Sequence, residues 1–357
     1  MKYLKDNIDY LQSISDDAEL YPVIKANAYG HGFKQIAQEI DKNNIKGVCI
    51  ATINELQDLI DLEVNYSILH LGKIAFSDLL LYEYDNVIAT INSMDDIRKI
   101  SALYNEDKCI RTHIKIDSGM TRMGCSIDEF DDILKKCLSI KNIRLEGIYS
   151  HLANSDNKDA QLNQKQIDLF DRVVCKIKNQ NINDIKFHIL NSGGLFNYGN
   201  YKYDLIRTGI SMYGISPLGT HNDNLKPVME FKAPVVLIRY INKGTMIGYG
   251  NSYEAKSNMN IAVIQCGYGD GIPFEYSNKG FVYYNKFKIP VIGRVSMDLI
   301  SVDITDIDIK INDYVTLWGS ILDIESRLEY IAKFFNNIPY TFITGITNRV
   351  KREYIYE

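Results

Sequence analysis

The stretch "YPVIKANAYGHGF", residues 21–33, decides the fold of this chain. It opens with the apolar run 21–24, which predicts a buried β-strand, and this run ends directly on Lys25. Small and turn-forming residues follow, among them Gly30 and Gly32. A lysine on the surface needs no such setting. The pattern therefore predicts a side chain that is fixed at the end of a strand for a chemical purpose.

Short β-branched apolar runs recur up to residue 209, and amphipathic stretches of helical length separate them. The predicted strands are 20–26, 47–52, 67–72, 86–91, 112–117, 144–150, 185–190 and 204–209. The predicted helices are 34–44, 53–62, 94–105, 128–140 and 161–180. Alternating strands and helices favour a parallel sheet. Eight such units in about 215 residues fit a (β/α)8 barrel, although an open doubly wound sheet gives the same alternation.

The pattern changes at "ISPLGTHNDNLKP" (215–227), which is polar and rich in turn formers. We predict an α/β barrel domain over 1–220 and a C-terminal, mainly-β domain over 221–357. The strand-like runs of the second domain are 231–241, 260–270, 280–293, 299–305 and 313–319, followed by one late helix over 327–337.

Charged and hydroxyl-bearing residues stand where the predicted barrel strands end, which is where barrels collect their catalytic groups. In chain order these residues are Lys25, Lys115, Asp117, Arg122, His151, Asn191, Ser192, Arg207 and Gly209. The last two barrel loops commonly bind phosphate through hydroxyls and backbone N–H groups, and "NSGG" and "RTGI" have suitable chemistry. We therefore predict a cationic mouth with a phosphate site.

A lysine among cations and beside a phosphate site has a specific use. Burial and nearby positive charge lower its pKa, so a neutral amine is available to form a Schiff base. The phosphate-bearing carbonyl cofactor that fits is pyridoxal phosphate (PLP). Taken singly, each residue also has an ordinary structural interpretation, as a solvated lysine, a hydrogen-bonded histidine or a turn. The hypothesis depends on their falling at the same end of successive strands.

Composition excludes several other classes. The net charge of −5 has mixed signs and favours neither nucleic acid nor an anionic membrane. No apolar run approaches the roughly 20 residues of a membrane span. The six cysteines lack CxxC pairing, so they are interpreted as reduced thiols of a cytoplasmic protein and not as a metal site.

With these motifs the chain resembles the alanine racemases, which are PLP-dependent enzymes with an N-terminal barrel and a C-terminal β domain. The resemblance covers almost the whole chain. "VIKANAYGHG" (23–32) implies that Lys25 forms the Schiff base. "HIKIDSGMTRMG" (113–124) implies that Arg122 binds the substrate and that Lys115 is the lysine carbamylated in many members. The other cofactor contacts that the resemblance implies are Tyr29, His151, Ser192, Arg207, Gly209, Ile210 and Tyr340.

The β domain carries further motifs of this family. "CGYGDGIP" (266–273) implies that Tyr268 is the second catalytic base. "VIGRVSMDLISVDIT" (291–305) implies that Met297 and Asp298 reach the substrate and that Arg294 lies in the entrance corridor. The resemblance therefore implies two-base interconversion of L-alanine and D-alanine for peptidoglycan. It also implies a homodimer in which Tyr268 reaches the active site of the other subunit.

Three departures from the family pattern stand out. The family has an extra strand before its first helix, whereas "YLKDNIDYLQSI" (3–14) lies almost at the start here, so either the start is truncated or the β domain is one strand short. Leu299 and Thr341 replace residues that are usually polar and acidic, respectively.

Several functions stay open at this point. They are a racemase of serine or another small amino acid, a related PLP decarboxylase, a non-catalytic PLP-binding protein and an inactive family member. The decarboxylase interpretation lacks its glycine-rich motifs and its catalytic cysteine, and "CGYGDGIP" disfavours a non-catalytic binder.

Overall fold

The computed structural model describes residues 1–102, 108–319 and 324–356. It divides into two compact units, each described by itself. The barrel unit comprises Lys5–Ala28 and Gly32–Met212, and the β unit comprises Met1–Leu4, Tyr29–His31 and Tyr213–Glu357. The predicted boundary at residue 220 stays a prediction, because two short N-terminal segments group with the later part of the chain.

The barrel unit is built on parallel strands. They are β1 (Glu19–Leu20), β2 (Gly47–Ile50), β3 (Ser67–His70), β4 (Val87–Ile91), β5 (Ile110–Lys115), β6 (Ile143–Tyr149), β7 (Lys186–His188) and β8 (Leu205–Ile206). Strands β2 to β7 pair in sequence order, and β1 pairs with β8. Parallel bridges from Val23 to Cys49 and from Asn191 to Arg207 join the two groups, so the strands close into a ring. The predicted (β/α)8 architecture is confirmed.

The first strand is shorter than predicted. Only Glu19 and Leu20 pair regularly with β8. The amides of Tyr21 and Val23 still bond to Ile206 and Thr208 across the gap, at 2.8 Å each. The strand direction is therefore kept up to Lys25.

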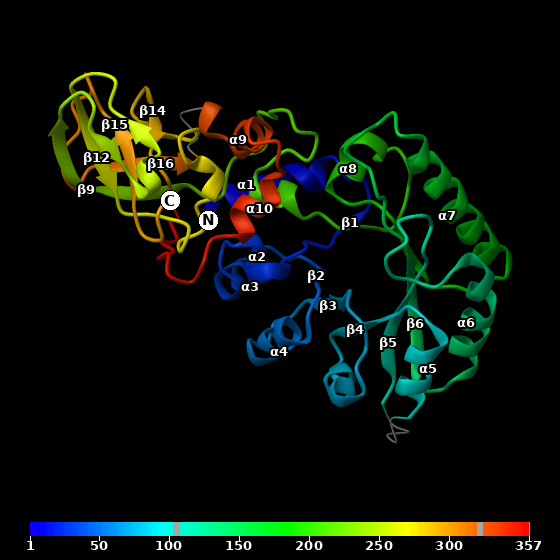
Figure 1. Ribbon diagram of the computed structural model, residues 1–357. Coiled ribbons are helices and arrows are strands. Elements are labelled where there is room, and N and C mark those ends of the chain that lie inside the picture. Colours follow the sequence, from blue (N-terminus) through cyan, green and yellow to red (C-terminus); the bar gives the residue numbers. More distant parts are fainter. Residues whose placement is uncertain (103–107, 320–323, 357) are drawn as a thin grey trace. The chain divides into compact units, whose positions relative to one another are not determined.

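Helices connect the strands, as Figure 1 shows for α5, α6 and α7 outside β5 and β6. The helices in this stretch of the chain are α1 (Lys2–Ser13), α3 (Phe33–Lys42), α4 (Ile53–Asp61), α5 (Met94–Ser101), α6 (Ile127–Ser139), α7 (Gln161–Asn179) and α8 (Ser192–Tyr198). The segment labelled α2 (Lys25–Tyr29) is a left-handed turn and not a right-handed helix. A 3-10 helix, η1 (Phe76–Glu83), lies between β3 and β4. The predicted end of the helix over 94–105 lies partly outside the described residues. None of the described helices combines the length and the apolar character needed to cross a membrane.

Local sequence explains why these helices form. Capping boxes start α4, α5 and α6, for example Ser126 with Glu129. Helix α6 buries Phe130, Ile133 and Cys137 on one stripe, which is the spacing of an amphipathic helix packed on a sheet.

The β unit contains a closed antiparallel barrel in the order β12-β15-β14-β13-β16-β9. Its strands are β9 (Phe231–Ile241), β12 (Met259–Ile264), β13 (Phe281–Tyr284), β14 (Phe287–Ile292), β15 (Ile300–Asp303) and β16 (Tyr314–Trp318). A hairpin of β10 (Met246–Ile247) and β11 (Tyr253–Glu254) accompanies them. The mainly-β second domain is confirmed.

The end of the β unit differs from the single late helix predicted over 327–337. It contains two short helices, α9 (Leu328–Phe334) and α10 (Pro339–Thr344). Asn336 takes a left-handed conformation with φ of 51°, and Pro339 starts the second helix at its first turn. A left-handed asparagine followed by a proline ends one helix and begins another.

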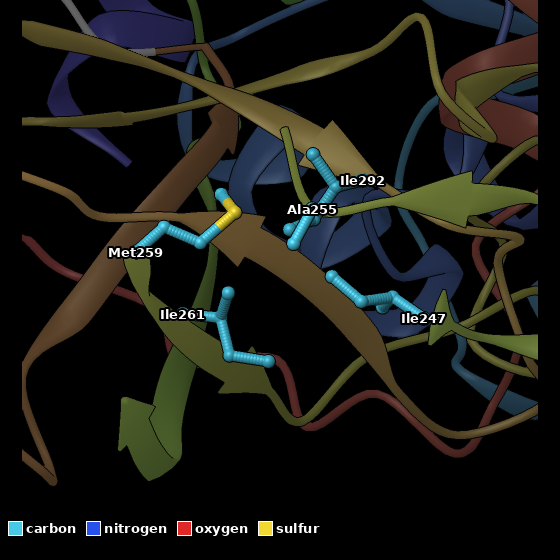
Figure 2. Packing of buried hydrophobic residues seen from close by; sticks show 5 residues of the cluster. All are labelled: Ile247, Ala255, Met259, Ile261 and Ile292. Atoms are coloured by element: carbon cyan, nitrogen blue, oxygen red, sulfur yellow. The ribbon is translucent and has the colours of Figure 1, made fainter. Parts of the chain in front are cut away.

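A cluster of buried apolar side chains joins the β10-β11 hairpin to strands of the antiparallel barrel in the β unit (Figure 2). Its members are Ile247, Ala255, Met259, Ile261 and Ile292. Met259 retains 4% exposure, whereas Met246, the neighbour of Ile247 on β10, is 45% exposed. The two methionines therefore form a matched pair with opposite environments.

We expect Met259→Ala to lower the free energy of unfolding by about 2–5 kcal/mol, because it removes apolar contacts and leaves a cavity. Met246→Ala makes the same chemical change in solvent, and we expect an effect within about 0.5 kcal/mol. Chemical denaturation monitored by circular dichroism measures both values. Equal losses in the two variants would contradict the packing described here.

Candidate active site

Lys25 is followed by a left-handed turn. The φ angles of Ala26, Asn27, Ala28 and Tyr29 are 53°, 56°, 51° and 52°, and all four residues carry a Cβ atom. This conformation costs roughly 1–2 kcal/mol per residue, and it usually occurs at single positions. A run of four is strained, and such strain persists only where surrounding bonds hold it.

Glu55 supplies bonds that hold this turn. Its Oε1 accepts the backbone N–H of Ala26 at 2.7 Å. Its Oε2 accepts from the amides of Ala51 and Thr52 at 2.8 and 3.0 Å, and Thr52 is the N-cap of α4. One carboxylate thus joins the residue after Lys25 to the end of β2 and the start of α4. The sequence analysis missed Glu55, because its spacing from Thr52 indicates only a helix start.

Cations gather at the carboxyl end of the barrel strands, as predicted. Lys25 has a lowered pKa because it is largely buried and because the Arg122 charge is near. Lys115, at the end of β5, is 7% exposed. Burial, followed by the charges of Arg207 and Arg122, lowers the pKa of Lys115 to about 8.

The loop that carries Arg122 is organised by Asp117. Its Oδ1 accepts the amides of Gly119, Met120 and Thr121 at 2.9, 3.0 and 3.0 Å. The carboxylate is therefore mostly committed to the loop backbone, although it also raises the pKa of Lys115 slightly against the stronger lowering influences. Arg122 itself is exposed, so its charge is free to face a ligand.

Arg207 is buried inside the barrel, with 3% exposure. Its guanidinium donates to the carbonyl of Ser150 at 2.6 Å, to Nδ1 of His151 at 3.1 Å and to Nδ1 of His188. It also lies over the Tyr149 ring, 4.9 Å from the centroid. Within the described residues no carboxylate forms an ion pair with it. Burial and then the Arg207 charge keep the pKa of His151 well below its ordinary value, so His151 accepts as a neutral imidazole.

The predicted phosphate loops come together in the structure. Ser192 is 4% exposed and begins α8, and its Oγ accepts the amide of Gly209 at 2.9 Å and the hydroxyl of Ser211 at 2.9 Å. Asn191 caps the same helix by accepting the amide of Gly194. Ile210 follows Gly209 and begins a 3-10 turn. Hydroxyls and backbone N–H groups at one place fit a phosphate.

The β unit holds two of the other predicted cofactor contacts. Tyr29 is 7% exposed, and its ring centroid lies 5.9 Å from that of Tyr340 in α10 and 5.1 Å from that of Tyr213. The two predicted phosphate ligands of this unit are therefore neighbours.

The predicted second base lies in a loop after β12. The amide of Tyr268 donates to Ser296 at 3.0 Å, and that of Gly269 donates to Met297 at 2.9 Å. Tyr268 and Met297 are 45% and 52% exposed. The structure thus brings Tyr268 and Met297 together on one exposed surface, with Asp298 next in the chain.

Arg349 is a residue that the sequence analysis did not single out. Its guanidinium bonds to Asp298 and lies 3.5 Å from Asp270, which follows Tyr268 by two residues. It therefore ties the two loops of the predicted substrate contacts to each other. Its position in "NRVKREY" gives no indication of this, because the partner residues are about 50 and 80 positions away.

Comparison with known proteins identifies the family of this chain. The family model for the alanine racemase N-terminal domain matches residues 1–217, and that for the alanine racemase C-terminal domain matches residues 228–354. This chain belongs to the alanine racemase family. An alanine racemase of Halothermothrix orenii is 32% identical over 98% of this chain and 94% of that protein. One from Vesicomyosocius okutanii is 33% identical over 97% and 95%, respectively.

Solved alanine racemases share the fold over the same length. The structure from Bartonella henselae, which has covalently bound pyridoxal phosphate, has a TM-score of 0.89 at 32% identity and covers 99% of this chain and 97% of that chain. The structure from Clostridium difficile 630 has a TM-score of 0.90 at 28% identity and covers 99% and 94%.

The lowered pKa of Lys115 gives a testable pH dependence. In bicarbonate-free buffer we expect one lysine Cε signal to titrate with a midpoint near 8 in NMR spectra of labelled protein, and to be absent in Lys115→Arg. Arg122→Gln removes a positive charge and moves this midpoint upward. Since the ordinary value is 10.5, unfolding takes up a proton between these two pH values, so this residue makes stability rise with pH there. A midpoint above 10 in the wild type would contradict the described burial.

Proposed function

We propose that this protein interconverts L-alanine and D-alanine with pyridoxal phosphate as its cofactor. The observation that carries the proposal is Lys25, a lysine of lowered pKa at a barrel strand end, beside cations and a phosphate cradle. Membership of the alanine racemase family gives the reaction class. We also propose that the D-alanine serves peptidoglycan synthesis in the cytoplasm, which suits the free thiols of all six cysteines.

The residues present fit the cofactor. Lys25 supplies the amine for its carbonyl carbon. The Ser192 hydroxyl and the amides of Gly209 and Ile210 suit its phosphate, and the hydroxyls of Tyr29 and Tyr340 complete this set. Arg207 is assigned to the ring nitrogen, with His151 holding the guanidinium. When bound, the cofactor withdraws electrons from the substrate Cα and so acidifies its proton.

Racemisation requires a proton to leave one face of Cα and another to return to the opposite face, so two bases are needed. Lys25 is the base for the D-side proton, since its lowered pKa makes the neutral amine accessible. Tyr268 is the base for the L-side proton. A phenol ordinarily titrates near 10, so it needs a neighbouring cation to act near neutral pH, and the proposal assigns this role to Arg122.

Arg207 also disfavours side reactions at the site. A guanidinium keeps its proton and presents only donors, so it does not give the ring nitrogen a full positive charge. A bound cofactor would then withdraw electrons from Cα only moderately, which would disfavour side reactions such as transamination.

The substrate contacts follow from charge and size. Arg122 is exposed at the cationic mouth and is assigned to the substrate carboxylate. Met297 and Asp298 are also assigned to the substrate, and the bulk of Met297 and Tyr340 suits a small side chain.

We propose that two copies of the chain form a homodimer with two shared sites, in which each copy provides Tyr268 to the other. Tyr268, Met297 and Leu299 are 45%, 52% and 41% exposed, and they present apolar surface around the base. Large exposed side chains grouped on one surface are typical of an interface.

The proposal predicts racemisation with solvent exchange. L-alanine incubated with the PLP-loaded protein in deuterated water yields D-alanine with deuterium at Cα, measured by chiral chromatography and NMR. We expect Tyr268→Phe to lower the rate by at least about 100-fold, because it removes a general base. Tyr249→Phe removes the hydroxyl of another exposed tyrosine of the β unit and leaves the rate unchanged.

The alternatives separate in the same experiment. L-serine run in parallel tests a broader small-amino-acid racemase. Exchange at Cα without inversion would contradict the two-base proposal. An absorbance change on adding PLP, without any exchange, would leave a non-catalytic PLP-binding protein and overturn the proposal.

Mixing two inactive variants tests the shared site. In a Lys25→Ala and Tyr268→Phe heterodimer, one site carries both changes and the other carries neither. Random mixing therefore restores about a quarter of wild-type activity, since half the dimers are mixed and each has one intact site of two. No recovery would mean that Lys25 and Tyr268 of one site belong to the same chain.

A further inference from the structure

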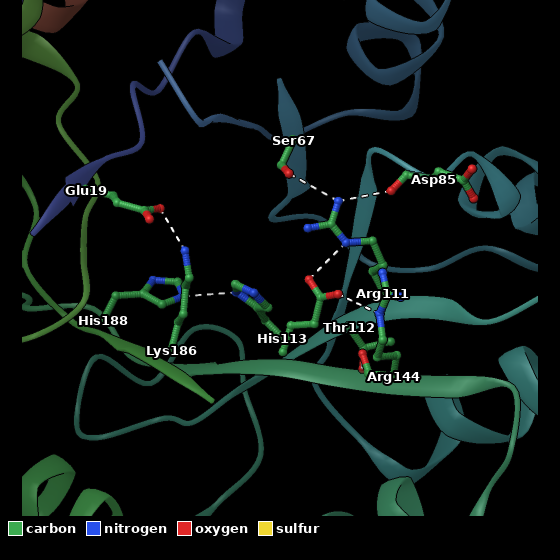
Figure 3. Close-up of polar contacts among 10 residues, drawn as sticks. Glu19, Ser67, Asp85, Arg111, Thr112, His113, Arg144, Lys186 and His188 are labelled. Carbon is green, nitrogen blue, oxygen red and sulfur yellow. Dashed lines mark hydrogen bonds and ion pairs between the residues drawn. The ribbon is translucent and has the colours of Figure 1, made fainter. Parts of the chain in front are cut away.

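Two imidazoles, those of His188 and His113, extend from Arg207 as a chain of hydrogen bonds in the interior of the barrel unit. His188 Nδ1 bonds to the Arg207 guanidinium, and His188 Nε2 lies 3.0 Å from Nδ1 of His113. His113 and His188 are 2% and 0% exposed. Figure 3 shows the contact between their rings as a dashed line. His113 is not among the predicted cofactor or substrate contacts, and the mechanism above does not use it.

The hydrogen-bond inventory determines where the protons lie. A guanidinium offers donors only, so His188 Nδ1 accepts. A neutral imidazole carries one N–H, and that of His188 is therefore on Nε2 and donates to His113 Nδ1. His113 in turn carries its own proton on Nε2. Burial, followed by Arg111, lowers the pKa of His113 to about 3, and burial, followed by Arg207, lowers that of His188, so both rings are neutral.

The strand pairing is adapted to the His113 ring. The register of β5 and β6 shifts, so that Thr112 pairs with Leu145 and His113 pairs with Gly147, which leaves Glu146 as the extra residue of a β-bulge. A Cβ atom on Gly147 would lie 2.7 Å from each of three atoms of the His113 ring. Only glycine leaves room for the imidazole in this place.

The charged side chains around the bulge form ion pairs with one another. The Glu146 carboxylate bonds to Nε of Arg111 at 2.9 Å and to Nε of Arg144 at 2.6 Å. Lys186, on the same strand as His188, points to Glu19 at 2.7 Å (Figure 3). The Tyr149 ring stacks on His188 with centroids 4.7 Å apart and planes 6° apart, so it fixes the plane of that ring.

We propose that His113 is a positioning residue for Arg207: it accepts the Nε2–H of His188, fixes the tautomer of His188, and so keeps Nδ1 available to the guanidinium. The proposal rests on the proposed function, in which Arg207 faces the cofactor ring. Without the acceptor, His188 has a buried N–H with no partner. If its proton moves to Nδ1, a donor faces a donor, and the guanidinium loses this bond.

A matched pair of variants tests the proposal. Leucine and asparagine have nearly the same shape and leave the same space when they replace histidine, but only asparagine places an acceptor oxygen where Nδ1 was. In ¹⁵N-histidine NMR of the PLP-loaded protein, we expect His188 to be an Nε2–H tautomer in the wild type and in His113→Asn. In His113→Leu this ring signal changes tautomer or broadens.

We expect kcat to depend on whether residue 113 provides a hydrogen-bond acceptor, and not on the volume of its side chain. We expect His113→Leu to lower kcat for racemisation about 10-fold or more, with a smaller change in KM, and His113→Asn to stay within about 3-fold of the wild type. Gly147→Ala presses on the His113 ring and is expected to reproduce the leucine result. Thermal melting of all three variants checks that they fold.

Each outcome supports or overturns the proposal. Equal activity losses in His113→Leu and His113→Asn, with an unchanged His188 tautomer, would reduce His113 to a packing role. A wild-type His188 that is protonated, or that carries its proton on Nδ1, would overturn the proposal even if His113→Leu fails to fold. If the wild type shows the expected tautomers but no racemisation, the proposed function fails and the tautomer assignment stands.

Discussion

The barrel unit must hold the Arg207 guanidinium in its interior, where the described residues provide no carboxylate partner for it. Burying a charge is costly unless hydrogen bonds replace the lost water. Here the replacement comes from neutral acceptors: a backbone carbonyl at Ser150, two imidazole nitrogens and the face of Tyr149. These groups lie at the ends of β6 and β7, next to the strand that carries Arg207, so the guanidinium depends on the register of neighbouring parallel strands. A carboxylate in place of the histidines would satisfy the charge, but it would also oppose the Arg207 charge, which, after burial, lowers the pKa of Lys115.

The second constraint is the left-handed turn after Lys25. Four residues with Cβ atoms in this conformation need an external tie, and Glu55 supplies it from a helix that the turn does not belong to. Because the same carboxylate also bonds to the amides of Ala51 and Thr52, the position of the lysine is coupled to the end of β2 and to the start of α4. The strain is therefore held by two regular elements, and the lysine backbone is fixed before any ligand arrives.

Periodicity was sufficient to predict the elements that depend on local sequence. The helix predicted over 128–140 is α6, and the strand predicted over 231–241 is β9. The helix has one apolar stripe, the strand has alternating apolar residues, and both have clear end signals in the sequence. The strand-end cations could also be predicted, since parallel strands of a barrel end at the same edge. The roles of Glu55 and His113 could not. Each role depends on a partner that is distant in sequence. The partner of His113 also depends on a β-bulge of one residue, which changes the residues that pair across β5 and β6 without altering the apolar pattern of the sequence.

The positive charges at the carboxyl ends of the barrel strands determine how the pKa of the lysines responds when an anion binds. The chain has a net charge of −5, yet Lys25, Lys115, Arg122 and Arg207 all bear on one place. Burial first, and then neighbouring positive charge, lowers the pKa of Lys25 and of Lys115, and any anion that binds there opposes the part that is due to charge. In a site whose only cations are lysines, binding of an anion would therefore raise the pKa of those lysines. They would become protonated and could no longer act as bases. Arginine does not titrate in this range, so Arg207 and Arg122 keep part of the field after an anion has bound. The buried position of Arg207 strengthens that contribution, because its surroundings screen charge less than water does. The neutral imidazoles that hold Arg207 thus also preserve a charge that, after burial, helps to lower the pKa of Lys115.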